Sequence, residues 1–587
     1  TVKKGVPVEW KYGSSAENSF EYYYETYQDS KYTGESIIVK AADLKNESGK
    51  MSTVDWEGRT AVLSDDSSEY IAFDVTVPES GLYQIEVDYY LTEGNSDAGK
   101  RSVTIDGEGP FTESNDLVFE RFFMDESEPV VNSLGDETRP SQIAIPSWRT
   151  TKLHDSTGIY SEPFSFYLEA GKHTVSLIYL KMNMYISEIR LVAPTQIRSY
   201  AEVSAEYAAK GYKAASAEKV HFQAELTAIE KNNPTLRREN DGDPMNEPKS
   251  DVSRKLNVMG GYRWRTGNQS ITWEFEVPED GLYKIAMYQK QMWNDGLPSY
   301  RQIAIDGEVP FQELSAYKFE YDTKWTLLTL SDDAGNPFQF YLTKGKHTMT
   351  MTVKIGELAP ILTSIQNDIG ILSDMLLKIN LLAGSDPDPN YDYQFFRKIP
   401  GLEENMKYIV QSMNEKYDLI KGLSEKTPAM ANNFLTIATQ IQDLIDDPFK
   451  IAAHVSEMES SQENLSQWYL SLQSLPLVID YFDVGSPNEE WKSKSSNIFQ
   501  RLGVTAMQFA SSFTKDYDNV GSILTDDVVV NTTINVWIAR GTEWAEVIKE
   551  MADEDFTPET GIAINVNVLP SSQLNAGNVN ALMLRSE

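Results

Sequence analysis

Side chains that could carry out catalysis are scarce in this sequence of 587 residues. It has five histidines and no cysteine, which excludes disulfides and thiolate metal sites. No HExxH, GxSxG, GxxxxGK(S/T) or GxGxxG pattern occurs. Pairs of carboxylates, which glycoside hydrolases use for catalysis, do not indicate such an enzyme here, because 88 acidic residues form many pairs by chance. We therefore expect binding chemistry, no catalytic residues, and a protein that is not an enzyme.

The charge balance limits the kinds of partner. Lys and Arg number 52 against 88 Asp and Glu, which gives a formal net charge of −36. Such a surface repels phosphate backbones and anionic lipids, so we expect neither a nucleic acid nor a membrane surface as partner. The most apolar stretch, 359–384, contains Gln, Asn, Asp and Lys and is typical of a helix, not of a membrane span. The start lacks the apolar run of a signal peptide, so we expect either a cytosolic protein or a trimmed export signal.

Two copies of one pattern must position any binding residues. "VPESGLY" (77–83) returns as "VPEDGLY" (277–283), and "IDGEGPF" (105–111) as "IDGEVPF" (305–311). The strand-like "ITWEFEV" before the second copy alternates apolar and polar residues, and Pro, Gly and Asp-Gly supply turns. A third match, "PFSFYLEAGKHT" with "PFQFYLTKGKHT", shows that the first copy carries about 26 extra residues. Each copy is predicted to be an antiparallel β-sandwich.

The rest of the chain changes periodicity twice. From 359 the apolar residues recur with the helical period, which predicts a bundle of four or five helices, with the last two near 450–473 and 488–514. A strand at 532–539, a helix at 542–556 and a strand at 562–570 then form a β-α-β unit. Two parallel strands cannot bury both of their faces, so this unit is predicted to be the start of a larger lobe.

The resulting fold class is multidomain, with two β-sandwiches, a helical bundle and an incomplete α/β lobe. A chain of this length is expected to hold roughly three to five domains. The predicted boundaries are an N-terminal segment at 1–34, the first sandwich at 35–196, a helical linker at 197–217, the second sandwich at 218–358, the bundle at 359–528 and the start of the α/β lobe at 529–587.

These parts together resemble a known family, the large extracellular solute-binding lipoproteins of carbohydrate ABC importers in Firmicutes. The segment "INVWIARGTEWAEVIKEMADEDFTPETGIAINVNVLP" is similar to the opening of their periplasmic-binding-type lobe, and 356–402 to the helical segment before it. The two repeats resemble the galactose-binding-like, jelly-roll sandwiches of carbohydrate-binding modules. In the family the lobe continues after the point where this chain ends, and a lipidated cysteine anchors the precursor; both are absent from this sequence.

The resemblance implies an extracellular, cell-surface protein that belongs to the substrate-binding component of a sugar transporter. Its expected partners are an oligo- or polysaccharide and, in a full-length protein, the ABC permease subunits. Membrane attachment would come only through the lipid anchor of the precursor. Two alternatives stay open: the accessory binding region of a modular glycoside hydrolase or lyase, and a non-binding surface spacer or adhesion protein.

Sugar recognition by such sandwiches uses flat aromatic faces with hydrogen-bonding side chains beside them. Trp293 is the leading candidate, because it occupies a loop in the second copy where the first copy has Glu93. Asn294, Asp295 and Tyr300 are expected to supply hydrogen bonds. Further candidates are Trp325 and Trp148, which lie at similar places in the two copies, and Tyr90.

Two other kinds of site follow from the resemblance. Modules of this type often open with Gln-Ala-Glu, whose Glu can bind a structural calcium ion; Glu225 matches this position, and Asp43 stands there in the first copy. No other cofactor is expected. In the incomplete lobe, the resemblance places Arg540, Thr542 and Trp544 near the solute cleft.

Overall fold

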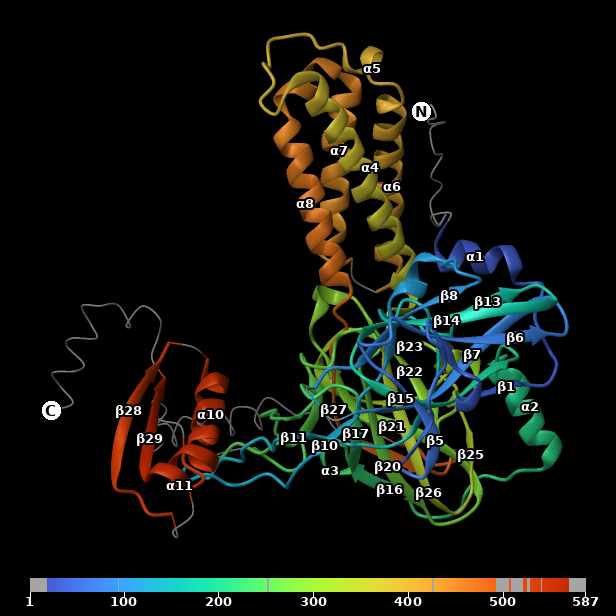
Figure 1. Ribbon diagram of the computed structural model, residues 1–587. Coiled ribbons are helices and arrows are strands. Elements are labelled where there is room, and N and C mark those ends of the chain that lie inside the picture. The colour runs from blue at the N-terminus through green and yellow to red at the C-terminus, as the bar shows by residue number, and fades with distance from the viewer. Residues whose placement is uncertain are drawn as a thin grey trace.

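The protein consists of a pair of β-sandwiches, a projecting helical bundle and a small α/β unit (Figure 1), which confirms the predicted fold class. The computed structural model describes residues 18–92, 94, 96–250, 253–424, 427–491, 506–507, 521–524, 528–539 and 541–568. Among these residues, no helix combines the length and apolar character that crossing a bilayer requires.

The first sandwich packs two antiparallel sheets around one core. One sheet has the order β12-β7-β15-β5-β4, with β1 beside β15 and β13 beside β7, and the other has the order β3-β2-β6-β14-β8-β9. The strands of the first sheet are β12 (Arg149–Lys152), β7 (Gly81–Leu91), β15 (Met184–Val192), β5 (Arg59–Ser64), β4 (Val54–Trp56), β1 (Ile37–Lys40) and β13 (Ser165–Leu168). Those of the second are β3 (Gly49–Lys50), β2 (Lys45–Asn46), β6 (Tyr70–Val77), β14 (Gly171–Lys181), β8 (Gly99–Ile105) and β9 (Leu117–Phe119). Helix α1 (Phe20–Tyr27) adds Phe20 to the same core, so part of the predicted N-terminal segment belongs to this sandwich.

The second sandwich repeats this plan. Its sheets have the orders β18-β19-β27-β21-β24, with β16 and β25 alongside, and β11-β10-β17-β20-β26-β22-β23. The strands of the first sheet are β18 (Arg238–Glu239), β19 (Val258–Gly261), β27 (Leu477–Gly485), β21 (Gly281–Gln291), β24 (Asp322–Thr329), β16 (Val220–Gln223) and β25 (Phe340–Leu342). The second contains β17 (Ala228–Lys231), β20 (Ser270–Val277), β26 (Gly345–Lys354), β22 (Ser299–Ile305) and β23 (Tyr317–Phe319), together with β10 (Phe123–Asp125) and β11 (Gln142–Ala144). A short helix, α3 (Ala224–Thr227), follows β16.

The repeated phrases form turns, as the sequence predicted. The hydroxyl groups of Tyr83 and Tyr283 donate to the carbonyl oxygens of Glu79 and Glu279, each at 2.7 Å, and so close the Pro-Glu turn in both copies. Before each turn, β6 and β20 bury alternate apolar residues in their cores. Helix α2 (Tyr200–Lys210) links the sandwiches with a capping box at Ser199, and Gly211 in the left-handed region ends it.

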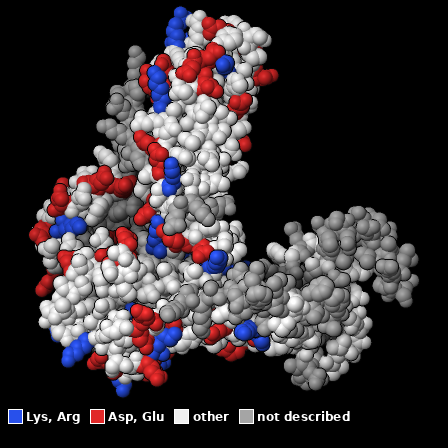
Figure 2. All heavy atoms as spheres, turned by 180° about the vertical axis from the view of Figure 1, so that it is seen from behind, with Lys and Arg blue, Asp and Glu red and all other residues white. Residues whose placement is uncertain are grey.

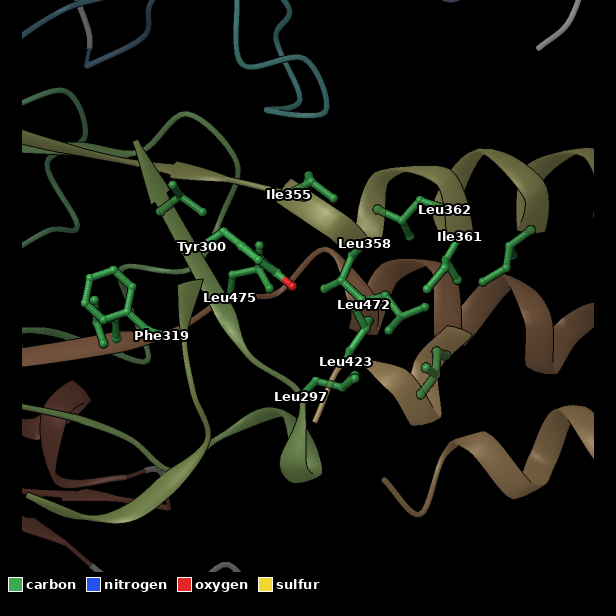
Figure 3. Packing of buried hydrophobic residues seen from close by; sticks show 14 of the residues in the cluster. Leu297, Tyr300, Phe319, Ile355, Leu358, Ile361, Leu362, Leu423, Leu472 and Leu475 are labelled. Atoms are coloured by element: carbon green, nitrogen blue, oxygen red, sulfur yellow. The ribbon is translucent and has the colours of Figure 1, made fainter. Parts of the chain in front are cut away.

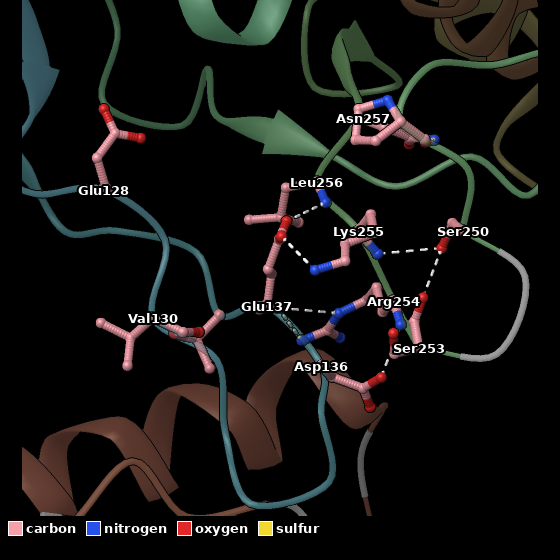
Figure 4. A network of polar contacts seen from close by, with 12 residues as sticks. Glu128, Val130, Asp136, Glu137, Ser250, Ser253, Arg254, Lys255, Leu256 and Asn257 are labelled. Carbon is pink, nitrogen blue, oxygen red and sulfur yellow. Dashed lines mark hydrogen bonds and ion pairs between the residues drawn. The ribbon is translucent and has the colours of Figure 1, made fainter.

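The extra residues of the first copy join the two sandwiches. Their strands β10 and β11 extend a sheet of the second sandwich, because Phe123 of β10 pairs with Lys231 of β17. Figure 4 shows the neighbouring polar network: the Glu137 carboxylate accepts from Lys255 Nζ and the Leu256 amide at 2.8 Å each. This inserted segment, residues 123–144, therefore makes the sandwiches a single assembly.

The bundle is an insertion within the second sandwich, which differs from the predicted boundaries. It contains α4 (Ala359–Ala383), α6 (Leu402–Gly422), α7 (Ala431–Asp446) and α8 (Val455–Leu472), with the short α5 (Phe395–Lys398) near its free end. The chain then returns as β27, between β19 and β21, although the sequence assigned 359–528 to the bundle. The helix predicted at 488–514 lies mostly outside the described residues. In the first sandwich the equivalent strands β14 and β15 are joined directly through Met182 and Asn183.

A continuous apolar core joins the bundle to the sandwich (Figure 3). Tyr300 of β22 and Leu475 before β27 meet Ile355, Leu358 and Leu472, all of which are buried. Figure 2 shows the bundle from behind as a column standing away from the sandwiches, with acidic side chains at its free end. The base of the bundle is therefore fixed by burial, while its length projects away from the sandwiches.

The last described element is the predicted β-α-β unit. Strands β28 (Thr532–Ile538) and β29 (Ile562–Val568) are parallel. Between them lie α10 (Thr542–Met551), a π-helical turn (Ala552–Phe556) and α11 (Thr557–Thr560). In Figure 1, α10 lies on the side of this small sheet that faces the sandwiches.

Candidate functional site

A pocket of about 660 Å³ opens on the outer side of the β18-β19-β27-β21-β24 sheet. Its size falls in the range of small-molecule sites. Strands β18 and β19, the turn after β19 and the end of β21 build its walls, which include Trp293, Tyr262, Arg263, Lys290 and Asp241. The pocket thus brings together segments that are distant in the sequence.

Two aromatic side chains give this pocket flat apolar surfaces. Trp293 is half-buried and packs on a cluster formed by Val258, Tyr288, Trp325, Val478 and Tyr481. Tyr262 is 56% exposed, and the Arg265 guanidinium lies 3.7 Å from its ring centroid. Gly261 lies beside Trp293 in the left-handed region at φ 72°, which favours glycine. Trp293 is therefore held by packing with part of its surface accessible.

Charged groups line the same pocket. The Asp241 carboxylate accepts from Lys290 Nζ and, at 3.2 Å, from the Trp325 indole N–H. Lys290 also lies 4.8 Å from the centre of the Trp325 ring. Arg263 Nε is 3.0 Å from Glu239 Oε1. Aromatic faces next to fixed donors and acceptors are the combination that binds the C–H faces and hydroxyl groups of a sugar.

The structure separates the other residues predicted around Trp293. Tyr300 does not border the pocket: it is 1% exposed, and its hydroxyl donates to Glu357 at 3.2 Å. The reason is the bundle, whose first turn places Gly356 directly against the Tyr300 ring. Asn294 lies in a short helical turn (Asn294–Gly296) at φ 66°, and the Asp295 side chain is outside the described residues. Trp325 is buried beneath the pocket, in the same cluster as Trp293.

Trp148 and Tyr90 belong to an aromatic group on the first sandwich. Tyr89 of β7 and Gln289 of β21 are equivalent positions of the two copies. Tyr89 pairs with Arg149 and Gln289 pairs with Thr326, so Trp148 and Trp325, each one residue earlier, are also equivalent. The Trp148 indole N–H donates to the Trp56 carbonyl at 3.3 Å. Tyr90 meets Trp148 edge-to-face at 5.7 Å between ring centroids. This group stays a weaker candidate, because these rings cover one another.

The predicted calcium position holds a pair of buried acids. Glu225 is buried, its Oε2 has no hydrogen-bond partner, and burial raises its pKa to about 8. Burial likewise raises the pKa of Asp480 to about 9, and the charge of Glu225 contributes to that shift. Asp480 was missed because the sequence placed its strand in the bundle. Asp43 is unlike this pair: its side chain is 64% exposed and lies 3.3 Å from Lys50.

Both buried carboxylates carry oxygen atoms, which are the ligands that a hard cation such as calcium takes. Among the described residues, no group of three or more His, Asp or Glu side chains is arranged to hold a metal ion. Glu225 and Asp480 would therefore need carbonyl oxygens or water to complete a coordination shell. A cation between them would replace the protons that burial otherwise retains.

Of the residues predicted in a solute cleft, only Trp544 can be placed. Arg540 and the Thr542 side chain are outside the described residues. Trp544, on the first turn of α10, is 64% exposed and lines a second cavity of about 360 Å³. Arg139 and Arg237 line the same cavity. Trp544 therefore faces the sandwiches. From the sequence we expected it to face a solute cleft between two lobes.

Comparison with known proteins identifies the bundle. Residues 360–473 match the family model described as "Bacterial solute-binding protein, 4-helix bundle domain". The match spans α4 to α8 and ends just before β27. No match was found among curated proteins.

Solved structures show a distant likeness. The family 35 carbohydrate-binding module from Clostridium thermocellum is 14% identical over 27% of this chain and 98% of its own, with a TM-score of 0.16. The module from Cellvibrio japonicus Abf62 is 12% identical over 27% and 95%, with a TM-score of 0.17. The Podospora anserina GH26-CBM35 β-(1,4)-mannanase is 15% identical over 27% of this chain, with a TM-score of 0.16, and only 28% of its own length is covered. At these scores the likeness adds nothing to the assignment of function.

Proposed function

We propose that this chain is an extracellular carbohydrate-binding protein and part of the substrate-binding component of a sugar ABC transporter. The observation that carries the proposal is the pocket of the second sandwich, where Trp293 and Tyr262 stand beside Arg263, Lys290 and Asp241. The match of the bundle to bacterial solute-binding proteins supports the transport setting and a role in binding without catalysis.

The remaining parts of the proposal follow from the resemblance of the whole chain. The full-length protein would be a lipid-anchored surface protein of a Firmicutes bacterium that delivers its sugar to ABC permease subunits. The bundle is joined to the second sandwich by a buried core, so it would act as a rigid spacer. A calcium ion at Glu225 and Asp480 would stabilise the second sandwich below its binding face.

A glycan array with the intact chain tests the proposal. We expect binding to one class of oligo- or polysaccharide, and we expect Trp293→Ala or Tyr262→Ala to lower that affinity roughly tenfold or more. Tyr391→Ala is the matched control, because Tyr391 is an exposed aromatic of the bundle, away from the pocket. Absence of binding to every glycan, with calcium present, would contradict the proposal and favour the spacer alternative.

A further inference from the structure

The pocket of the second sandwich is next to the cavity below α10. Thr235 and Arg263 line both hollows, so the two spaces are neighbours across these side chains. One end is bounded by Trp293 and the other by Trp544. The volumes, about 660 Å³ and about 360 Å³, each fall in the range of ligand sites.

A row of ion pairs connects the two ends. Glu546 Oε2 of α10 lies 3.2 Å from Arg139 Nη1 of the inserted segment. Arg139 Nη2 lies 2.6 Å from Glu239 Oε2 of β18, and Glu239 Oε1 forms the ion pair with Arg263 that is described above. Arg254, in the loop before β19, pairs with the other carboxylate oxygen of Glu546. These side chains are mostly buried, so the row holds α10 against the second sandwich.

Among the described residues, Trp544 on α10 lies outside the buried core of the α/β unit. The small core of the α/β unit is built from Ala545 and Val566 with Ile538, Ile564 and Val568, and Trp544 is exposed beside it. Glu546, only two residues further on, is the residue fixed by both arginines. The ion pairs therefore hold α10, which carries Trp544, against the second sandwich, which carries Trp293 and Tyr262.

We propose that the second sandwich and the α/β unit bind one oligosaccharide between them, with sugar rings on Trp293 and Tyr262 at one end and on Trp544 at the other. This inference rests on the proposed function and deepens it: the ligand is a chain of sugars, and it is shared by a binding module and the start of the solute-binding lobe. A disaccharide would contact one end only, whereas a longer chain would gain contacts at both.

Calorimetry with oligosaccharides of increasing length tests this proposal. The probes are cello-, xylo-, manno- and malto-oligosaccharides from disaccharide to hexasaccharide, titrated into the whole chain. For the series that binds, we expect Trp544→Ala to lower hexasaccharide affinity roughly tenfold or more and disaccharide affinity much less. Trp293→Ala is expected to weaken every length. Glu546→Gln keeps the size of the side chain, and its loss of affinity should also grow with ligand length.

The outcomes separate the two proposals. If no probe binds, the proposed function and this inference both fail. If a probe binds, and Trp544→Ala has the same small effect at every ligand length, then the ligand does not contact both the second sandwich and the α/β unit. In that case this inference fails and the proposed function stands. Tyr391→Ala again serves as the control, and the thermal unfolding of each variant shows that lost affinity does not come from lost folding.

Discussion

Asp368 and Lys416 form an ion pair between α4 and α6 in which both side chains are fully buried. The Lys416 ammonium also donates to the hydroxyl oxygens of Ser364 and Ser412 at 2.6 Å each. The Ser412 hydroxyl donates to the Asp368 carboxylate at 3.0 Å. Every member of this group is therefore satisfied inside the bundle, where an unpaired charge would be costly.

Removing one member of this buried pair is predicted to destabilise the bundle strongly. We expect Lys416→Ala to lower the free energy of unfolding by about 3–5 kcal/mol, because it leaves the Asp368 carboxylate buried without an opposite charge. Lys378→Ala is the matched control, since Lys378 pairs with Asp374 on the exposed side of α4 and should cost under about 1 kcal/mol. Urea unfolding measures both. Equal losses for the two variants would show that the buried pair has no special role.

The buried acids of the second sandwich predict an unusual dependence of stability on pH. Unfolded carboxyl groups titrate near pH 4, whereas folding raises the pKa of Glu225 to about 8 and that of Asp480 to about 9. Between these values the folded state binds more protons than the unfolded state. Without calcium, the free energy of unfolding therefore falls as the pH rises from about 4 to about 8.

Glu225→Gln is predicted to remove much of that dependence. At pH 8, with a chelator present to remove calcium, this variant should be more stable than the wild type by on the order of a few kcal/mol. The reason is that glutamine at position 225 has no charge to bury. Calcium is expected to stabilise the wild type and to have little effect on the variant. Asp43→Asn, at the exposed equivalent position, should change neither behaviour. Identical pH profiles for wild type and Glu225→Gln would contradict this account.

The elements found from the sequence are those with a strong local period. The alternation in β6 and β20 and the helical stripe of α6 placed their buried faces correctly, since burial on one side imposes those periods. Strand β27 was missed because its partners β19 and β21 lie far away in the sequence. Strands β10 and β11 are three residues each, too short to carry a period.

The candidate site was found only in part, for a related reason. Trp293 could be selected because the first copy has no aromatic residue at that place. Tyr262 and Arg263 lie in a turn outside the repeated phrases, and only the folded sheet brings them beside Trp293. Tyr300 was selected wrongly because its burial depends on the bundle, which enters the sandwich after β26. Residue types selected Trp293 as a candidate, and the topology determined which residues lie beside it.

A repeated arginine is predicted to anchor the base of the bundle. Arg101 donates to the carbonyl oxygens of Lys181 and Met182 at the β14–β15 turn, at 2.9 and 3.1 Å. Arg301, the equivalent residue in β22, donates to the carbonyl oxygen of Leu475, where the chain returns from the bundle, at 2.8 Å. The same arginine position thus holds a tight turn in one copy and the base of the inserted bundle in the other.

Arg301→Ala is expected to cost about 3–5 kcal/mol of stability, because it leaves buried carbonyl oxygens without donors and opens a cavity beside Trp264. Arg301→Lys should recover little, since an ammonium cannot reproduce the planar set of donors. Hydrogen exchange is expected to rise first around Leu475 and Ile355. Uniform exchange across the sandwich and bundle would show that Arg301 does not act at their junction.

The position of β27 predicts which fragment of the second sandwich can fold. A fragment of residues 218–358 contains all of the second repeat that the sequence predicted, but it lacks β27. Without that strand, β16 and β19 lose their pairing with the rest of the sheet, and the buried side chains of Ile479, Phe482 and Val484 leave the core. We expect this fragment to lack a cooperative unfolding transition, whereas residues 218–491 unfold cooperatively and keep their near-ultraviolet circular dichroism. A cooperative transition in the shorter fragment would mean that the bundle follows a complete sandwich and is not inserted into one.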